Sequence, residues 1–504
     1  MPSCRAGGSE SVATDPSTKF IESLQPQISA CDTFATKAEI RRGCKARREM
    51  ASSGLFIPMP IYVQSAPACN GGSTAMARKS LVLLEGHGSI GLLYVNAARR
   101  LDLHPITLSA DPTQYDYLAA EGIDAIQVDT NNLDELIREC SRLGATLDIA
   151  GITGFSGADE SIYATVGKLC RHFDLPGPNP ASIEQCCDKF SQRQLLAEAG
   201  VPVPAYRLAS NAAEVESCAA EIGLPVVLKP TLGSGSSGVR LCRNVDELAE
   251  HATYLLDGQH AWRSSPRILV EEFAQGPYCS AHIMGNKVIA IDAADFDRPP
   301  YFVFRHFTCP APLTDDERKR ICDVSLACLP ALGLGWGPMC VELRRTKRGP
   351  VVIEVNPRIP GGTSPRLVQA ACGVDLIAEH IKLVIGNEWD LRRRHSHIAA
   401  AQCLNADRDG ILDWIDGDSR AAAMPGVTEV KLYIKPKAPI VRKGDYRDRI
   451  GHVIAASPNR ARTEAILQQA IDLISWSITP FPSVGGQGQS DAHQSSAQTQ
   501  AAPK

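Results

Sequence analysis

The sequence predicts a mixed α/β and α+β protein in which a parallel sheet is followed by antiparallel sheets. Over residues 79–178, short apolar runs alternate with amphipathic segments, and a helical crossover is needed to return the next strand in the same direction. Further along, two pairs of apolar strands meet at tight turns, Gly285-Asn286 and residues 346–349, as in antiparallel hairpins. We therefore expect both architectures in one chain.

The parallel unit begins at Lys79, where the apolar run LVLLE precedes the turn GHGSIG and a helix from about Ile90. Three more strands follow, PITLS, AIQVD and DIAGI, and helices at about 114–120 and 133–143 separate them. This order predicts a Rossmann-like sheet over residues 79–178.

The second unit is predicted over residues 179–390 and opens with the helix DKFSQRQLLAEAG, which Gly200 ends. The strands PVVLKP, GVRLC and RILVEEF, with a helix over 245–256, form a small α+β lid at about 200–270. The hairpin SAHIMG and KVIAIDA, a helix over 315–332 and the hairpin GPMCVELRR and GPVVIEVNP complete this unit. It is the antiparallel core of the predicted fold.

The rest of the chain falls into segments that differ in the periodicity of their apolar residues. Residues 391–480 are strand-rich and end in a helix over 462–474, which predicts a C-terminal α+β subdomain. Residues 1–78 lack lasting periodicity, and 481–504 are of low complexity, so we expect a loosely ordered extension and a disordered tail.

Composition excludes several classes of protein. Hydrophobic residues make up 44% and charged residues 21% of the 504, as in a soluble globular protein. The net charge of -4 gives no surplus of basic residues for binding nucleic acid or an anionic membrane. The sequence contains no run of about 18 apolar residues, so no membrane-spanning helix is predicted. The 17 cysteines are dispersed without a C-x-x-C pair, which argues against structural zinc. We expect a cytoplasmic protein with neither nucleic-acid nor membrane partners.

The turn Gly86-x-Gly88-x-x-Gly91 lies between a strand and a helix, where a dinucleotide-binding turn belongs. Asp111 follows at about the spacing of a ribose ligand. A dehydrogenase is therefore one hypothesis, and a structural or substrate-binding turn is the other, because any tight strand-to-helix turn favours glycine.

A stronger phosphate-binding signal follows the strand that contains Lys229. The loop consists of small residues: Gly233, Ser234, Gly235, Ser236, Ser237 and Gly238. Such residues allow backbone N–H groups and hydroxyls to approach phosphate oxygens. Lys229 stands at the strand end and can reach a phosphate from the side, whereas the alternative is a flexible surface loop.

Hard oxygen ligands gather on the second hairpin. Glu342 lies on one strand, and Glu354 and Asn356 lie two apart on the next, so they share a face. Two carboxylates and an amide oxygen suit magnesium, while the alternative is two exposed acids on a sheet edge. Arg358 again points to this face and can hold a transferring phosphoryl group.

Taken together, the CDKF helix, the lysine before a glycine–serine loop, VEEF, VEL and IEVNPR resemble the ATP-grasp superfamily over residues 79–478. Within it, the chain is most similar to carboxylate–amine ligases of the L-amino acid ligase group, which includes a bacilysin-forming dipeptide ligase. Biotin carboxylase is a more distant relative. The resemblance implies an ATP-grasp fold, with a pre-ATP-grasp domain, a lid, a core and a C-terminal subdomain.

The resemblance also implies roles for individual residues. Lys189 and Lys229 would contact ATP phosphates beneath the glycine–serine loop. Glu271 would accept from the adenine amino group, and Glu272, Phe273 and Ala274 would form the hinge that reads the purine edge. Glu342, Glu354 and Asn356 would bind magnesium. Arg358 would lie near the acyl phosphate, and the turn amides of Gly361 and Gly362 would face the substrate carboxylate.

The chain departs from many relatives at Tyr278, where they carry a glutamate that holds the ribose hydroxyls. A phenol can also bond a hydroxyl, so Tyr278 is the candidate for this contact. His306 is a weaker candidate for the group that removes the amine proton.

The implied reaction is ATP-dependent formation of an amide bond between an amino acid or small carboxylate and an amine. The cofactors would be ATP and Mg²⁺, with Mn²⁺ as an alternative metal, and a homodimer is a family expectation. Three alternatives stay open: a biotin carboxylase type of carboxylase, a non-catalytic nucleotide-binding protein, and the dehydrogenase.

Overall fold

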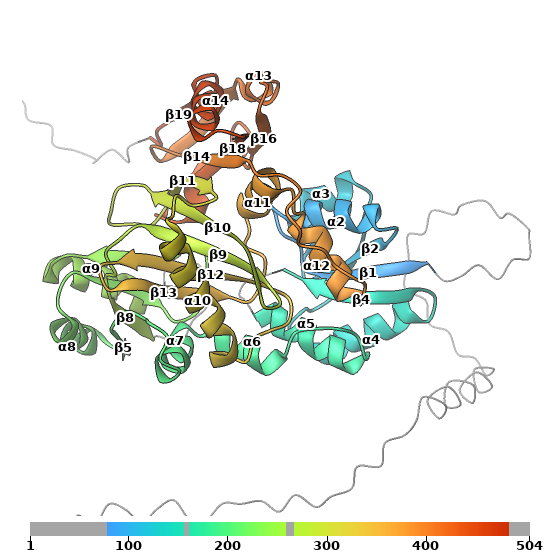
Figure 1. Ribbon diagram of the computed structural model, residues 1–504, viewed down its shortest axis with the longest axis horizontal. Coiled ribbons are helices and arrows are strands. Elements are labelled where there is room, and N and C mark those ends of the chain that lie inside the picture. Colours follow the sequence, from blue (N-terminus) through green and yellow to red (C-terminus); the bar gives the residue numbers. More distant parts are fainter. Residues whose placement is uncertain (1–77, 156–160, 259–266, 483–504) are drawn as a thin grey trace, which may run out of the picture. The chain divides into compact units, whose positions relative to one another are not determined.

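The protein is described by a computed structural model that covers residues 78–155, 161–258 and 267–482. The fold class predicted from the sequence is confirmed, because a parallel sheet and antiparallel sheets occur in one chain (Figure 1). The predicted N-terminal extension and C-terminal tail fall outside the described residues, apart from Arg78, Phe481 and Pro482.

The N-terminal unit is a four-stranded parallel sheet of order β3-β2-β1-β4. Its central strand β1 (Lys79–Leu84) is buried at five of six positions, which explains its continuous apolar run. The other strands are β2 (His104–Ser109), β3 (Asp124–Gln127) and β4 (Asp148–Gly154). The helices are α2 (Gly91–Arg100), α3 (Asp116–Ala120), α4 (Leu133–Gly144) and α5 (Ser161–His172), with a 3-10 turn at Pro112–Gln114.

The lid is a separate four-stranded antiparallel sheet of order β5-β8-β6-β7. Its strands are β5 (Tyr206–Ala209), β6 (Val226–Pro230), β7 (Arg240–Cys242) and β8 (Ile268–Glu272), and its helices are α8 (Ala212–Ile222) and α9 (Val245–Leu256). Two helices lead into it, α6 (Pro180–Cys187) and α7 (Lys189–Glu198). The glycine–serine loop connects β6 to β7, as the sequence predicts.

An eight-stranded sheet of order β13-β12-β9-β10-β11-β14-β18-β16 forms the centre of the described chain. Its first part contains β9 (Tyr278–Met284), β10 (Lys287–Phe296), β11 (Phe304–Cys309), β12 (Pro338–Thr346) and β13 (Gly349–Asn356), with α10 (Asp315–Ala331) between the hairpins. Both predicted hairpins are present, at Gly285-Asn286 and residues 346–349. The β9–β12 pairing brings the two hairpins side by side.

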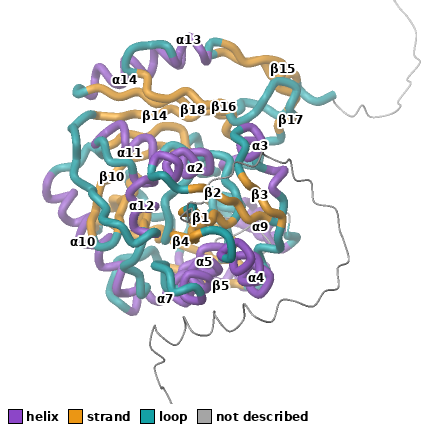
Figure 2. The backbone as a smooth tube through the Cα atoms, turned by 90° about the vertical axis from the view of Figure 1, so that its right-hand side faces the viewer, coloured by secondary structure: helices purple, strands orange, loops and turns teal. Residues whose placement is uncertain are grey.

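Three of the C-terminal strands continue this central sheet. β14 (Ile398–Asn405) pairs with β11, and β18 (Arg449–Ser457) and β16 (Val427–Leu432) follow. The helices α14 (Arg460–Asp472) and α13 (Asp418–Ala422) lie over these strands (Figure 2). A three-stranded sheet of order β17-β15-β19 completes the subdomain, with β15 (Gly410–Asp416), β17 (Pro439–Ile440) and β19 (Ser475–Thr479).

Two apolar clusters cover the two faces of the central sheet. One face packs against α7 and α10 through Leu196, Ile321 and neighbouring residues. The other face, which carries Tyr278, packs toward α2 of the N-terminal unit and toward α11 (Ser364–Cys372) and α12 (Leu376–Val384). This second face is the one on which Glu342 and Asn356 stand, so the site lies where these units meet.

Candidate active site

The three predicted metal-binding side chains lie together on β12 and β13. Glu342 pairs with Glu354 across the two strands, and the Asn356 Nδ2 atom donates to Glu342 Oε1 at 3.2 Å. A β-bulge follows Glu342, so Ile353 and Glu354 both line the same cavity. Bulges re-aim side chains in this way beside functional sites. Arg358 lines the cavity as well, and its guanidinium lies 3.4 Å from Asn356 Oδ1.

The two carboxylates differ in electrostatic environment. Burial and the negative charge of Glu354 raise the pKa of Glu342 to about 7. Burial alone would also raise the pKa of Glu354, but the adjacent Lys189 ammonium outweighs it and keeps that pKa below its ordinary value. Two acids this close favour a bound cation. Across the ranges that the structure describes, no group of three His, Cys, Asp or Glu side chains could hold a metal.

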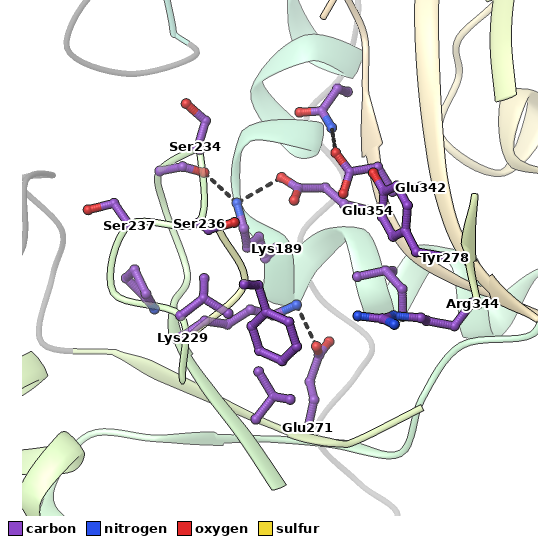
Figure 3. A pocket seen from close by; sticks show the side chains of 18 of the residues that line it. Lys189, Lys229, Ser234, Ser236, Ser237, Glu271, Tyr278, Glu342, Arg344 and Glu354 are labelled. Carbon is purple, nitrogen blue, oxygen red and sulfur yellow. Dashed lines mark hydrogen bonds and ion pairs between the residues drawn. The ribbon is translucent and has the colours of Figure 1, made fainter. Parts of the chain in front are cut away.

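Both predicted phosphate-binding lysines point into the cavity, and each has an acidic partner (Figure 3). The Lys189 Nζ atom lies 2.8 Å from Glu354 Oε1 and donates to the Gly233 carbonyl at 2.5 Å. The Lys229 Nζ atom lies 2.5 Å from Glu271 Oε2. Lys189 therefore joins the glycine–serine loop to the carboxylates, and Lys229 joins the loop's leading strand to the hinge.

Arg193 is a buried member of this network that the sequence analysis missed. Its Nε atom lies 2.6 Å from Glu271 Oε1, and its guanidinium also donates to the Ile353 carbonyl. The residue is fully buried on α7, one helical turn after Lys189. The four-residue spacing between Lys189 and Arg193 is the feature of the sequence that could have predicted this position, because it places both cations on one face of the helix.

The glycine–serine loop is folded in a left-handed backbone conformation at four positions. These have φ of +118° at Gly233, +67° at Gly235, +64° at Ser236 and +73° at Gly238. Three of the four are glycine, the residue that adopts this region without strain. The Ser237 side chain is buried, and its Oγ atom has no hydrogen-bond partner among the described residues. A hydroxyl of this kind can donate to a phosphate oxygen.

The predicted hinge residues line the cavity beside this loop. Glu272 directs its carboxylate away, to Arg348 at 2.6 Å and to the Ala205 N–H at 3.2 Å. Phe273 and Ala274 follow, with Ala274 buried. The backbone of this segment is therefore the part available to a base.

An arginine in an aromatic cluster, which was not predicted from the sequence, forms another wall of the cavity. The Arg344 guanidinium carbon lies 4.9 Å from the Phe296 ring centroid and 5.8–5.9 Å from those of Phe273, Tyr278 and Phe302. Its Nη1 atom donates to the Gly276 carbonyl at 3.0 Å. Arg344 stands two residues after Glu342 on β12, and this alternation was the available signal.

Tyr278 is buried in the same cluster and lines the cavity. Its ring meets Phe296 and Phe304 edge-on, and its side chain lies beside Glu342 (Figure 3). Burial raises the pKa of Tyr278 well above its ordinary value, so it stays a neutral donor. In the described structure the Tyr278 phenol therefore lies next to the carboxylate pair of Glu342 and Glu354.

The two glycine turns of the chain contact each other. The Gly362 N–H donates to Ser89 Oγ at 2.9 Å, and Gly361 lies so close to His87 that a Cβ would stand 2.9 Å from its ring. Burial, together with the charges of Arg358 and Lys431, lowers the pKa of His87 to about 4. The His87 imidazole is therefore uncharged at pH 7, so the positive charges of Arg358 and Lys431 do not repel it.

Gly86 and Gly91 have packing roles in the first turn. A Cβ on Gly86 would stand 2.3 Å from the Tyr115 ring, and one on Gly91 would stand 2.2 Å from the Tyr117 hydroxyl. Close packing accounts for these glycines without a dinucleotide. His306, the weaker candidate, lies on β11 beside Thr308 and Gln402 and is not among the residues that line the cavity.

Comparison with known proteins identifies the family of this chain. Residues 188–392 match the ATP-binding domain of the carbamoyl-phosphate synthase L chain, and residues 402–479 match the L-amino acid ligase C-terminal domain 2. Protein y4rH of Sinorhizobium fredii (strain NBRC 101917 / NGR234) is 60% identical over 412 residues, which cover 82% of this chain and 86% of that protein. The chain belongs to the ATP-grasp ligase family.

More distant relatives of this ATP-grasp ligase include enzymes named for their activity. It is 26% identical to carnosine synthase 1 of Mus musculus over 77% of its own length, but it spans only half of that protein. The L-amino acid ligase of Bacillus licheniformis shares its fold with a TM-score of 0.67 and 19% identity, covering 80% of this chain and 100% of that one. In the part of the ligase that the structure describes, no helix is both long and apolar enough to cross a membrane.

Proposed function

We propose that this ATP-grasp ligase joins a carboxylate to an amine through an acyl phosphate, with ATP as the phosphoryl donor. The observation that carries the proposal is the convergence of two acids, an amide, two lysines, an arginine and a glycine–serine loop on one cavity. Among the relatives, an L-amino acid ligase and carnosine synthase support amino acids as the substrates.

We propose a distinct place in the cavity for each part of a nucleotide. The hinge at Glu271, Glu272, Phe273 and Ala274 would receive the base, with Arg344 and the aromatic cluster as the opposite wall. The glycine–serine loop would cover the phosphates, with Lys189 and Lys229 beneath. Because Tyr278 lies beside Glu342, we propose that its hydroxyl orients this carboxylate and that it contacts the ribose only with its ring face (Figure 3).

Glu342, Glu354 and Asn356 fit a magnesium ion, because they present hard oxygens around two closely spaced acids. The ion would neutralise charge on the phosphate oxygens during transfer. Asn356 and Tyr278 orient the Glu342 carboxylate, and Lys189 balances the charge of Glu354. These contacts hold the oxygens ready before a ligand enters.

In the first step, an oxygen of the substrate carboxylate attacks the γ-phosphorus, and the bond to the ADP oxygen breaks. In the second step, the amine nitrogen attacks the acyl carbon, inorganic phosphate leaves, and the nitrogen loses a proton. Arg358 would stabilise charge on the transferring group, and the Gly361–Gly362 turn would hold the acid beside it. A closed loop keeps water from the acyl phosphate.

The proposal is tested by ADP release with Mg²⁺ and a mixture of the twenty amino acids. We expect ADP, phosphate and a product whose mass equals two amino acids less one water. Glu354→Gln removes the charge of a proposed metal ligand and should abolish ADP release. Glu139→Gln alters a partly buried acid that is paired with Arg142 on α4, outside the cavity lining, and should leave ADP release unchanged. Release that requires bicarbonate and biotin would instead support a carboxylase, and ATP binding without release would support a nucleotide-binding protein.

A further inference from the structure

The turn formed by residues 443–448 lies against the middle of the glycine–serine loop. The Tyr446 N–H donates to the Gly235 carbonyl at 3.1 Å. The Tyr446 ring packs on the same residue, since a Cβ on Gly235 would stand 2.4 Å from its Cδ1 atom. The loop that covers the cavity thus rests on the C-terminal subdomain.

The same turn is linked to the lid a second time, through Tyr301 in the connection between β10 and β11. Gly444 lies beneath the Tyr301 ring, where a Cβ would stand 2.5 Å from Cγ. Tyr301 in turn holds β7, through a cation–π contact with Arg240 at 5.9 Å and a β-bridge between the two residues. The turn therefore contacts the loop directly and is linked to β7, the strand into which the loop runs, through Tyr301.

The 443–448 turn is a stiff support. Asp448 accepts from the N–H groups of Lys443 and Gly444 at 2.6 and 2.9 Å. Asp445, whose side chain is buried, forms a 2.5 Å ion pair with Arg447. Hydrogen bonds within the turn fix its shape, so this shape does not depend on the loop that the turn touches.

Tyr446 itself is 48% exposed. A ring that served only to fill a core would be buried, whereas this ring has one side on Gly235 and much of the rest in solvent. One hydrogen bond and one glycine–ring contact form a weak link of the kind that can open to admit a nucleotide and close again.

We propose that Tyr446 is a positioning residue that holds the glycine–serine loop closed over the nucleotide phosphates and so keeps water from the acyl phosphate. The inference rests on the proposed function for its chemistry, but the closure itself can be measured without turnover. It gives the C-terminal subdomain a part in the reaction although that subdomain supplies none of the proposed metal ligands.

Two substitutions separate the ring from the backbone donor. Tyr446→Ala removes the ring and keeps the N–H. Tyr446→Pro removes both, and proline suits the first residue of the 3-10 turn Tyr446–Asp448 because Asp445 before it is extended, with φ -144° and ψ -167°. Trp414→Ala is the matched control, since Trp414 is a comparably exposed aromatic residue of the same subdomain.

The first readout is hydrogen–deuterium exchange of residues 232–238 with Mg²⁺ and a non-hydrolysable ATP analogue. Exchange should be faster in Tyr446→Ala than in the parent, and faster again by about three- to tenfold in Tyr446→Pro, the population change that one hydrogen bond supports. Trp414→Ala should match the parent. Equal exchange in all four proteins would overturn the proposal, whether or not the chain proves to be a ligase.

The second readout is the ratio of ADP to amide product in the amino-acid mixture. Both Tyr446 variants should form more ADP than amide, because an opened loop lets water hydrolyse the acyl phosphate. A ratio that stays at the parent value while the rate falls would show a merely structural role and would also overturn the inference. Absence of ADP in the parent would count against the ligase proposal alone.

Discussion

Lys189 and Glu354 form an ion pair at the centre of the candidate site, with 2.8 Å between Nζ and Oε1. The Lys189 side chain is 7% exposed, and the same ammonium reaches the Gly233 carbonyl. One side chain therefore connects the phosphate-covering loop, the first turn of α7 and the proposed metal ligands. Its removal should affect all three.

Lys189→Met should lower kcat for ADP formation by about 10²–10³-fold, as does loss of other preorganised charge donors. The physical reason is that the γ-phosphoryl group loses a positive partner and Glu354 loses its counter-ion. Steady-state kinetics at saturating ATP would measure the effect. Lys168→Met removes an exposed ion pair with Glu184 and should leave kcat unchanged. A loss of less than tenfold in Lys189→Met would contradict the assigned role.

Magnesium affinity should depend on pH through Glu342. Its pKa is raised to about 7, so protonation below that value removes a ligand charge. We expect Mg²⁺ affinity to weaken as pH falls from 8 to 6, approaching about tenfold per pH unit below 7. Isothermal titration calorimetry with the ATP analogue present would measure it. In Glu342→Gln the affinity should be weak at every pH, and a steep pH dependence there would contradict the assignment.

The same carboxyl makes the metal-free protein less stable at higher pH. Its ordinary pKa is 4.5, so between pH 4.5 and about 7 the unfolded chain has released a proton that the folded carboxyl retains. The unfolded state then binds fewer protons, and the free energy of unfolding falls as pH rises through this window. Urea unfolding with a chelator should show this trend, and it should shrink in Glu342→Gln.

Arg193→Met should destabilise the protein by about 3–5 kcal/mol, because it leaves part of the Glu271 charge buried and unpaired. Arg193 is fully buried, and its 2.6 Å pair with Glu271 is shielded from solvent. Urea unfolding would measure the change. Arg207→Met breaks an exposed pair with Glu221 at 2.9 Å and should cost less than about 1 kcal/mol. Equal losses in the two variants would refute the buried role of Arg193.

Arg344→Leu should raise KM for ATP by about three- to tenfold. This factor corresponds to the free energy of a partly buried cation–π contact. The guanidinium holds Phe296, Phe302 and Phe273 together beside the nucleotide end of the cavity. The KM values for the amino-acid substrates should change less than that for ATP. A rise confined to the amino-acid KM would place Arg344 in the acid or amine site instead.

Much of the site could be predicted from the sequence because its residues are local. Glu354, Asn356 and Arg358 alternate on one strand and its extension, so the period of two is enough to place them on one face. Glu342 joins them because a tight turn connects its strand to theirs. The glycine–serine loop is equally local, since its composition alone permits its backbone conformation.

The partners of these residues could not be predicted in the same way. Lys229 meets Glu271 because β6 pairs with β8, and the aromatic cluster forms because β9, β10 and β12 are neighbours. Arg193 looks like a surface residue in the polar segment SQRQ, yet it is fully buried. A polar residue is predicted exposed unless its buried counter-charge is known, and that counter-charge lies on another element.

The sequence by itself determined the order of strands and helices, the set of proposed metal ligands and the glycine–serine loop, because each depends on residue type and short-range spacing. The tertiary structure alone decided which lysine pairs with which acid, where Arg344 finds its aromatic rings, and that Tyr446 rests on Gly235. The last contact exists because the C-terminal strands extend the central sheet and bring the 443–448 turn to the lid. Contacts between distant segments follow from the pairing of strands in the sheets, and this pairing cannot be predicted from local composition.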